Sequence, residues 1–412
     1  MTPHMFPTVV LLVFMNVRLP AKGCPLPCAC FASITDCRNE NLTSVPQGIG
    51  LQTETLFLTA NQLTTIPPRA FWNLTSLTFL DLSNNKVIPD NDTLDYVRNL
   101  LSLDFSENDI QTIPTDIFQP TPKLVWLNLA KNQLKSLPND VIRNLHNLTY
   151  LDLSDNFIEL HNNTFEGLYS LDTLILSGNR LSSLPSVAFH TISQLQILEL
   201  SNNKLKYLPN NLFDKKDSLT DLILSNNTLT GSIFPALRGL SSLKYLYLSN
   251  NRISSLPPFP LESFPLLHKV TLSHNSLSVL PDGLLKGLNQ LSVLELSDNS
   301  IAQLPKELFQ NSSSLEYLHM DRNMFSEMPM LAGLQNVVEL TLCCSKIQHW
   351  PSEVTLSQLE YLETLDLSSN LIVNFDMNIV RNNTKLTNVL LTNNPICVNM
   401  NLSVAMPLKC IN

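Results

Sequence analysis

The sequence predicts an α/β solenoid, a horseshoe whose concave face is a parallel β-sheet and whose convex side is irregular or 3-10 helical. The frame L-x-x-L-x-L-x-x-N-x-I, seen clearly at Leu148–Ile158, returns fifteen times with steps of 22 to 25 residues, most of them 24. Because spacing, apolar positions and asparagine recur together, stacked repeats are indicated. The asparagine position is filled by Asn61, Asn85, Asn108, Asn132, Asn156, Asn179, Asn203, Asn227, Asn251, Asn275, Asn299, Asn323, Ser345, Asn370 and Asn394.

The L-x-L centre of each frame predicts one short β-strand. Alternation places its leucines on one face and the intervening residues on the other. A single short strand cannot bury its leucines alone, so successive turns must stack with their strands in parallel, about 4.8 Å apart. Amphipathic helices would need an apolar spacing of about 3.6 residues throughout, and the recurring prolines argue against them.

The residues after each strand predict how the turn closes. An asparagine amide donates and accepts at once, so we expect it to satisfy buried backbone groups of its own and neighbouring turns. Most turns then continue x-x-L-P-x-x-x-F, as in Leu184 to Phe189. The proline stiffens the return path outside the sheet, and the phenylalanine is expected to fill the wide back of the turn.

Composition narrows the classes of function. The chain has 412 residues, which the unbroken repeat assigns to one elongated solenoid rather than to several globular domains. A net charge of -9 disfavours a nucleic-acid partner. The sequence contains no G-x-S-x-G, no H-E-x-x-H and no glycine-rich phosphate loop. We therefore expect neither an enzyme nor a cofactor.

Segment 1–23 is interpreted as a signal peptide. Residues 6–17 are apolar but too short to span a bilayer comfortably, although no Lys or Arg precedes them. No apolar segment follows the last repeat, so no direct membrane insertion of this chain is expected. The prediction is an extracellular, secreted protein, or the ectodomain form of a cell-surface receptor.

Residues 24–50 contain four cysteines, at Cys24, Cys28, Cys30 and Cys37. Disulfides and a zinc site are the two readings of such a cluster. Disulfides are favoured, because no histidine lies among the cysteines and an export signal precedes them. An open solenoid end also needs a cover for its leucines and its edge strand.

The spacing C-P-L-P-C-A-C, then six residues to Cys37, then L-T-S-V-P at 42–46, resembles the N-terminal cysteine cap of extracellular leucine-rich repeat proteins. That family includes small leucine-rich proteoglycans, Slit proteins, variable lymphocyte receptors and Toll-like receptor ectodomains. The resemblance implies that Cys24 pairs with Cys30 and Cys28 with Cys37.

Residues 51–396 are interpreted as fifteen repeats without a linker, and 397–412 as a short or truncated C-terminal cap. The family's C-terminal cap usually has C-x-C and two later cysteines, whereas only Cys410 follows Cys397 here. A single Cys397–Cys410 bridge is therefore expected. Repeat thirteen is short and carries Cys343 and Cys344, which we expect to be a packed thiol or a bonded pair rather than a reactive site.

Nine Asn-x-Ser/Thr sequons predict a glycoprotein, although the repeat itself supplies many asparagines. They lie at Asn41, Asn73, Asn91, Asn147, Asn162, Asn226, Asn311, Asn382 and Asn401.

The residues between the strand leucines are expected to share the concave face and to form the ligand-binding surface. Aromatic side chains are concentrated there, with the main surface predicted in the N-terminal half, and large exposed apolar groups in one patch usually mark a contact site. The competing reading is that these rings pack on each other or under a glycan, for instance from Asn147 beside Tyr150. Acids lie among them, either to solubilise the sheet or to select a neutral or basic partner. The predicted ligand-binding residues are Phe57, Phe79, Asp81, Asp104, Trp126, Tyr150, Asp152, Tyr245, Tyr247 and Tyr317.

Two functions compete for this surface. The first is receptor-type, innate-immune or adhesion recognition of a protein or glycan ligand on the concave face. The second is a structural or adhesion role in the extracellular matrix, resembling small leucine-rich proteoglycans and acting in assembly. Fifteen repeats are more than that proteoglycan group usually has, which favours recognition. Separately, the weakly covered C-terminal end is expected to fray first, or to be buried by self-association as a homodimer or by a downstream cap.

Overall fold

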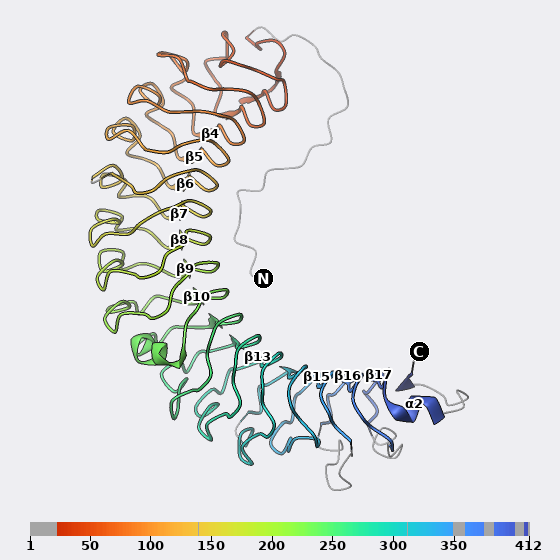
Figure 1. Ribbon diagram of the computed structural model, residues 1–412. Helices are drawn as coiled ribbons and strands as arrows, with labels where there is room; N and C mark the ends of the chain where they lie inside the picture. The colour runs from red at the N-terminus through yellow and green to blue at the C-terminus, as the bar shows by residue number, and fades with distance from the viewer. Residues whose placement is uncertain are drawn as a thin grey trace.

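The computed structural model describes residues 23–138, 140–310, 312–348, 359–374, 383–399 and 408–410. The apolar segment 6–17 and the sequons at Asn311, Asn382 and Asn401 lie outside these residues. Within them the turns stack into one curved solenoid, with the strands along the inner side of the arc (Figure 1). The predicted fold class is confirmed.

Each predicted repeat contributes one three-residue strand, from β3 to β17. Consecutive strands pair in parallel without a shift in register, so that Leu80 lies opposite Leu103 and Leu103 opposite Leu127. The strands are β1 Ala29–Phe31, β2 Ile34–Asp36, β3 Thr55–Phe57, β4 Phe79–Asp81, β5 Ser102–Asp104, β6 Trp126–Asn128, β7 Tyr150–Asp152, β8 Thr173–Ile175, β9 Ile197–Glu199, β10 Asp221–Ile223, β11 Tyr245–Tyr247, β12 Lys269–Thr271, β13 Val293–Glu295, β14 Tyr317–His319, β15 Glu339–Thr341, β16 Thr364–Asp366, β17 Asn388–Leu390 and β18 Leu408–Lys409.

The core lies between the sheet and the convex return segments. The middle residue of every strand from β3 to β17 is fully buried, as alternation requires. At the back, the rings of Phe165, Phe189 and Phe213 stack from turn to turn, with centroids 6.1 and 6.5 Å apart. The repeating phenylalanine therefore fills the wide side of the turn, as expected. A 3-10 helix, η1 (Gly231–Leu237), replaces the usual return path in repeat eight.

Both ends of the described sheet carry disulfides. At the N-terminus, β1 and β2 form an antiparallel hairpin that adds to β3. Cys24 is bonded to Cys30 and Cys28 to Cys37, the pairing that the resemblance implies. At the other end, the short helix α2 (Pro395–Asn399) follows β17, β18 pairs with β17, and Cys397 is bonded to Cys410.

Candidate binding surface

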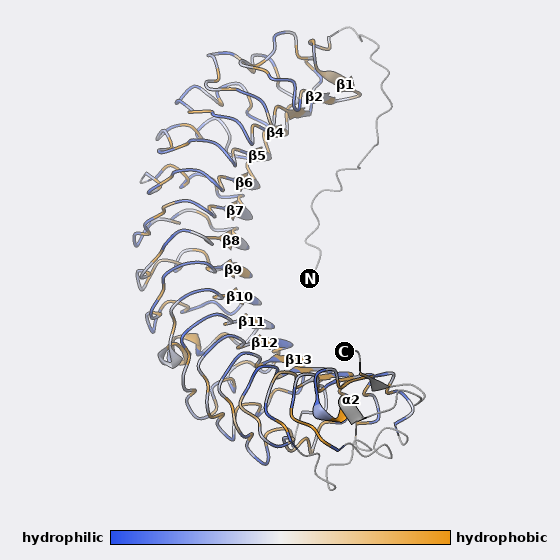
Figure 2. Ribbon diagram, turned by 45° about the vertical axis from the view of Figure 1, so that its right-hand side comes forward, coloured by the Kyte–Doolittle hydropathy of each residue, from blue (hydrophilic) through white to orange (hydrophobic). Residues whose placement is uncertain are grey.

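The first and third residues of each strand form two rows along the inner side of the arc, where Figure 2 shows the strands one above another. These residues are mostly half-buried, while the leucine between them is buried. Because the pairing has no shift, each row runs straight from turn to turn. A row therefore presents a fixed set of side chains on a preformed sheet.

The structure joins four of the predicted aromatic residues into two pairs. The rings of Trp126 and Tyr150 stack with centroids 5.4 Å apart and an interplanar angle of 15°. The rings of Phe57 and Phe79 meet at 5.5 Å, tilted by 55°. Ser102 occupies the strand between Phe79 and Trp126, so the two pairs are separated by one small residue. We call these four residues with Asp81, Asp104 and Asp152 the N-terminal patch.

The three acids of the N-terminal patch are fixed by local hydrogen bonds. The backbone N–H groups of Ser83, Ser106 and Ser154 donate to Asp81, Asp104 and Asp152 over 2.9, 2.8 and 2.8 Å. Each acid therefore braces the turn after its own strand, which explains part of its recurrence in the repeat. The second carboxylate oxygen of Asp104 accepts from Asn128 Nδ2 over 3.2 Å.

Burial also changes how these acids titrate. Burial raises the pKa of Asp104 to about 6, against the favourable hydrogen bonds from Ser106, and the nearby Asp81 carboxylate adds to the rise. Burial likewise raises the pKa values of Asp81 and Asp152. Charged forms of these groups are costly in this environment, so a cation brought against them by a partner would stabilise them.

The N-terminal cap shows how a cation sits on this face. The Arg38 guanidinium lies 4.8 Å from the centroid of the Phe57 ring and donates to both carboxylate oxygens of Asp36, over 2.9 and 2.6 Å. The arrangement combines a charge-assisted double hydrogen bond with a cation–π contact.

The remaining predicted aromatic residues lie farther along the sheet. Tyr245 and Tyr247 are on β11, four strands beyond Tyr150, and Tyr317 is on β14. The Tyr245 ring lies 6.2 Å from that of His268, and Lys269 Nζ lies 5.9 Å from the Tyr247 ring. These tyrosines therefore lie on the same concave face but outside the N-terminal half, in which the main surface is predicted.

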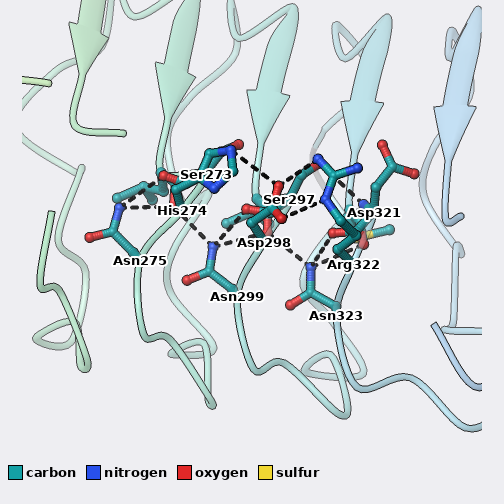
Figure 3. Close-up of polar contacts among 12 residues, drawn as sticks. Ser273, His274, Asn275, Ser297, Asp298, Asn299, Asp321, Arg322 and Asn323 are labelled. Carbon is teal, nitrogen blue, oxygen red and sulfur yellow. Dashed lines mark hydrogen bonds and ion pairs between the residues drawn. The ribbon is translucent and has the colours of Figure 1, made fainter. Parts of the chain in front are cut away.

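A column of charged residues lies immediately before the ladder asparagine, and the predicted site residues do not include it. This position turns the backbone left-handed, with φ values of 52°, 57° and 51° at His274, Asp298 and Arg322. The Asp298 carboxylate accepts from Arg322 Nε and Nη2 over 2.5 and 2.6 Å, and His274 Nε2 lies 3.3 Å from it (Figure 3). Asp298 and Arg322 are 24 residues apart, which is the usual length of one repeat. This spacing of opposite charges could have predicted the contact from the sequence.

The expectation that Cys344 of repeat thirteen is a packed thiol is wrong. Cys344 is exposed rather than packed, because it also occupies the left-handed position, at φ 60°, where side chains point outward. Cys343 is half-buried beside it.

All six described sequon asparagines are exposed, at Asn41, Asn73, Asn91, Asn147, Asn162 and Asn226.

The described residues contain neither a candidate metal site nor a candidate membrane-spanning helix. No group of three or more His, Cys, Asp or Glu side chains in the described ranges could hold a metal ion. Among the same residues, no helix has both the length and the apolar character needed to cross a bilayer.

Comparisons with known proteins agree with this architecture. The family model described as leucine rich repeat matches residues 37–87, 122–181, 170–229 and 265–325, and a model for two copies of the repeat matches 217–262. The chain is 32% identical over 128 residues to leucine-rich repeat-containing protein 3 of Danio rerio, covering 28% of this chain and 47% of that protein.

Two further similarities are shorter or structural. The chain is 45% identical over 65 residues to the acid labile subunit of the insulin-like growth factor-binding protein complex of Mus musculus, covering 14% of this chain and 11% of that protein. Both curated relatives are therefore matched over less than half of their own length. The Drosophila Toll–Spatzle complex aligns with a TM-score of 0.67 at 23% identity, over 84% of this chain and 52% of that one. The chain belongs to the leucine-rich repeat family.

Proposed function

We propose that this protein is an extracellular recognition module that binds a protein ligand through the N-terminal patch of its concave face. The stacked pair of Trp126 and Tyr150 carries the proposal. Trp and Tyr are the residues that most often dominate binding energy at interfaces. Held on a rigid sheet by parallel neighbours, the two rings lose little conformational entropy when a partner covers them.

The charge of the patch defines the partner's chemistry. Asp81, Asp104 and Asp152 lie beside the rings, and burial disfavours their charged forms. A partner segment with Arg or Lys would therefore gain both charge complementarity and cation–π contact. Arg38 on Phe57 and Asp36 is an example of this contact within the chain itself.

Similar proteins support a protein ligand. A protein with this fold, Toll, forms a complex with Spatzle, and the acid labile subunit takes its name from a binding-protein complex. The cap disulfides are compatible with an extracellular location. We further propose the domain organisation given above and glycans at the sequons.

The experiment has two stages. The purified mature chain is first used to capture partners from extracellular fluid, and the affinity of the recovered partner is then measured with variants. Trp126→Ala and Tyr150→Ala should each weaken binding by roughly tenfold or more, as expected of interface hot spots. Tyr207→Ala is the matched control, because Tyr207 is an exposed aromatic residue that belongs to no concave strand.

The outcomes separate the two candidate functions. If both patch variants fold and bind normally while a convex variant abolishes binding, the concave assignment is wrong. If the chain captures only copies of itself or matrix components, the structural or adhesion role is favoured instead.

A further inference from the structure

The turn of repeat thirteen lacks the asparagine that braces its neighbours. In the adjacent turns, the Ile301 N–H donates to Asn323 Oδ1 over 3.0 Å and the Ile347 N–H to Asn370 Oδ1 over 3.1 Å. Ser345 occupies the equivalent position in repeat thirteen. By analogy with the adjacent turns, an asparagine at this position would accept a hydrogen bond from the Phe325 N–H. The Ser345 Oγ is buried without a hydrogen-bond partner among the described residues. The hydroxyl is too short to replace the amide, so the brace of this turn is missing.

Two cysteines directly precede this position, and their sulfur atoms are close together. Cys343 Sγ and Cys344 Sγ lie 2.7 Å apart. Even carbon atoms that are not bonded to each other pack best at about 3.5–4.0 Å. The backbone is held in place on both residues: the Cys343 N–H donates to Asp321 Oδ1 over 2.7 Å, and the Cys344 N–H donates to the Ser368 carbonyl over 2.9 Å.

We propose that Cys343 and Cys344 form a reversible disulfide, and that the resulting ring stiffens this turn in place of the missing asparagine. In the oxidation, the two thiols give up two electrons and two protons as the Sγ–Sγ bond forms. A small-molecule disulfide such as oxidised glutathione accepts them, and its own S–S bond breaks to give two thiols. A ring between adjacent residues restricts ψ of Cys343 and φ of Cys344, which lie in the segment that the asparagine amide braces in the other turns, as Asn323 does by donating to the Met320 and Asp321 carbonyls.

The surroundings of the pair suit a bond that can be opened and closed. Cys344 is exposed, so a reductant can reach its sulfur, and exposed disulfides are the labile ones. Burial raises the pKa of the Cys343 thiol, with added effects from Cys344 and from the Asp321 and Asp366 carboxylates. The Cys343 thiolate is therefore disfavoured, so we expect exchange with a small thiol or disulfide to take place at the exposed Cys344 sulfur.

The state of the pair is tested by peptide mapping of the full chain. The protein is denatured without reductant, treated with iodoacetamide and digested. The peptide that contains residues 343 and 344 should carry no alkyl group and should have the mass of the dithiol less two hydrogens. After prior treatment with dithiothreitol it should carry two alkyl groups. Two alkyl groups without reductant would overturn the proposal.

The stiffening is tested by hydrogen exchange of the folded chain before and after mild reduction, with mapping to verify that the cap disulfides remain closed. Exchange at residues 343–347 should rise by roughly fivefold or more on reduction. The Ser345→Asn variant restores the brace, so its exchange should change much less. Wild-type exchange that is unaffected by verified reduction would refute the bracing role. Neither measurement depends on the concave ligand, so their failure would leave the proposed recognition function standing.

Discussion

The side-chain amide of Asn203 lies 3.0 Å from the carbonyl oxygen of Leu176, one turn earlier in the solenoid. The same nitrogen donates to Leu200 of its own turn over 3.0 Å, and the Leu181 N–H donates to Asn203 Oδ1 over 2.8 Å. One buried side chain thus satisfies backbone groups of two turns, and the same pattern recurs along the ladder.

Replacing this amide should destabilise the middle of the solenoid. Asn203→Leu leaves the Leu181 N–H without its partner and removes one of the two hydrogen bonds that the Leu176 carbonyl accepts. We expect this to cost about 1–3 kcal/mol in the free energy of unfolding. Urea denaturation measures this, with Asn144→Leu, at an exposed position, as the control. Equal stability of Asn203→Leu and wild type would show that the ladder is dispensable.

Lys216 is expected to be a destabilising residue. It is 1% exposed and its Nζ has no hydrogen-bond partner among the described residues, at a position that is Ile192 and Leu240 in neighbouring turns. Lys216→Leu should therefore stabilise the protein by roughly 1–3 kcal/mol. The exposed Lys206 supplies the control, Lys206→Leu.

The same variant has a defined pH dependence. Burial lowers the pKa of Lys216 below its usual value of 10.5. Between the folded and unfolded pKa values of Lys216, the unfolded chain binds more protons than the folded chain. The free energy of unfolding of the wild type therefore falls as pH falls through this range and recovers as pH rises. The difference in Tm between wild type and Lys216→Leu should therefore shrink from pH 7 to pH 10. A constant difference would contradict the assignment.

Asp104 should have the opposite effect on stability as pH rises. Its pKa is raised to about 6, above the unfolded value, so the folded chain binds more protons between about pH 4 and 6. Stability from this group is present at low pH and is lost as pH rises through that window. Asp104→Asn should be more stable than wild type by about 1–2 kcal/mol at pH 7 and nearly equal to it at pH 4. The exposed control is Asp116→Asn.

The C-terminal end should open first. Val389 and Leu391 are fully buried, yet beyond them the described chain offers only α2, the two-residue strand β18 and the Cys397–Cys410 bond. Hydrogen exchange should be faster at residues 386–396 than at 195–205. Slower exchange at 386–396 in a verified monomer would contradict this. Association through this end, which the sequence suggested as a homodimer, would appear as concentration-dependent protection.

The solenoid could be predicted because its information is periodic. The strand leucines, and in most turns the asparagine and the phenylalanine, have the same environment from turn to turn, so the pattern at Leu148–Ile158 predicts most of the described repeats. The contacts that set the binding surface are not periodic. They depend on which side chains become neighbours when the turns stack. Examples are Ser102, which separates the two ring pairs, and Arg38 of the cap, which contacts the Phe57 ring.

Repeat thirteen shows the same limit. The sequence identified the replacement of asparagine by Ser345, but it left the cysteines as a packed thiol or a pair. Their exposure follows from a left-handed backbone at Cys344, a conformation that the repeat uses in every turn for residues of very different chemistry. Consensus therefore predicted the backbone better than it predicted the side chain.

The phenylalanine stack has a geometric consequence for recognition. Rings at the back of the turns repeat every 6.1 to 6.5 Å, whereas parallel strands at the front repeat about every 4.8 Å. Each turn is therefore a wedge, and the volume of its rear side chains sets the radius of the arch. Replacing Phe189 with a smaller residue would reduce the curvature and move distant points of the concave surface apart. Buried residues that contact no ligand would therefore still determine the size of partner that fits within the arch.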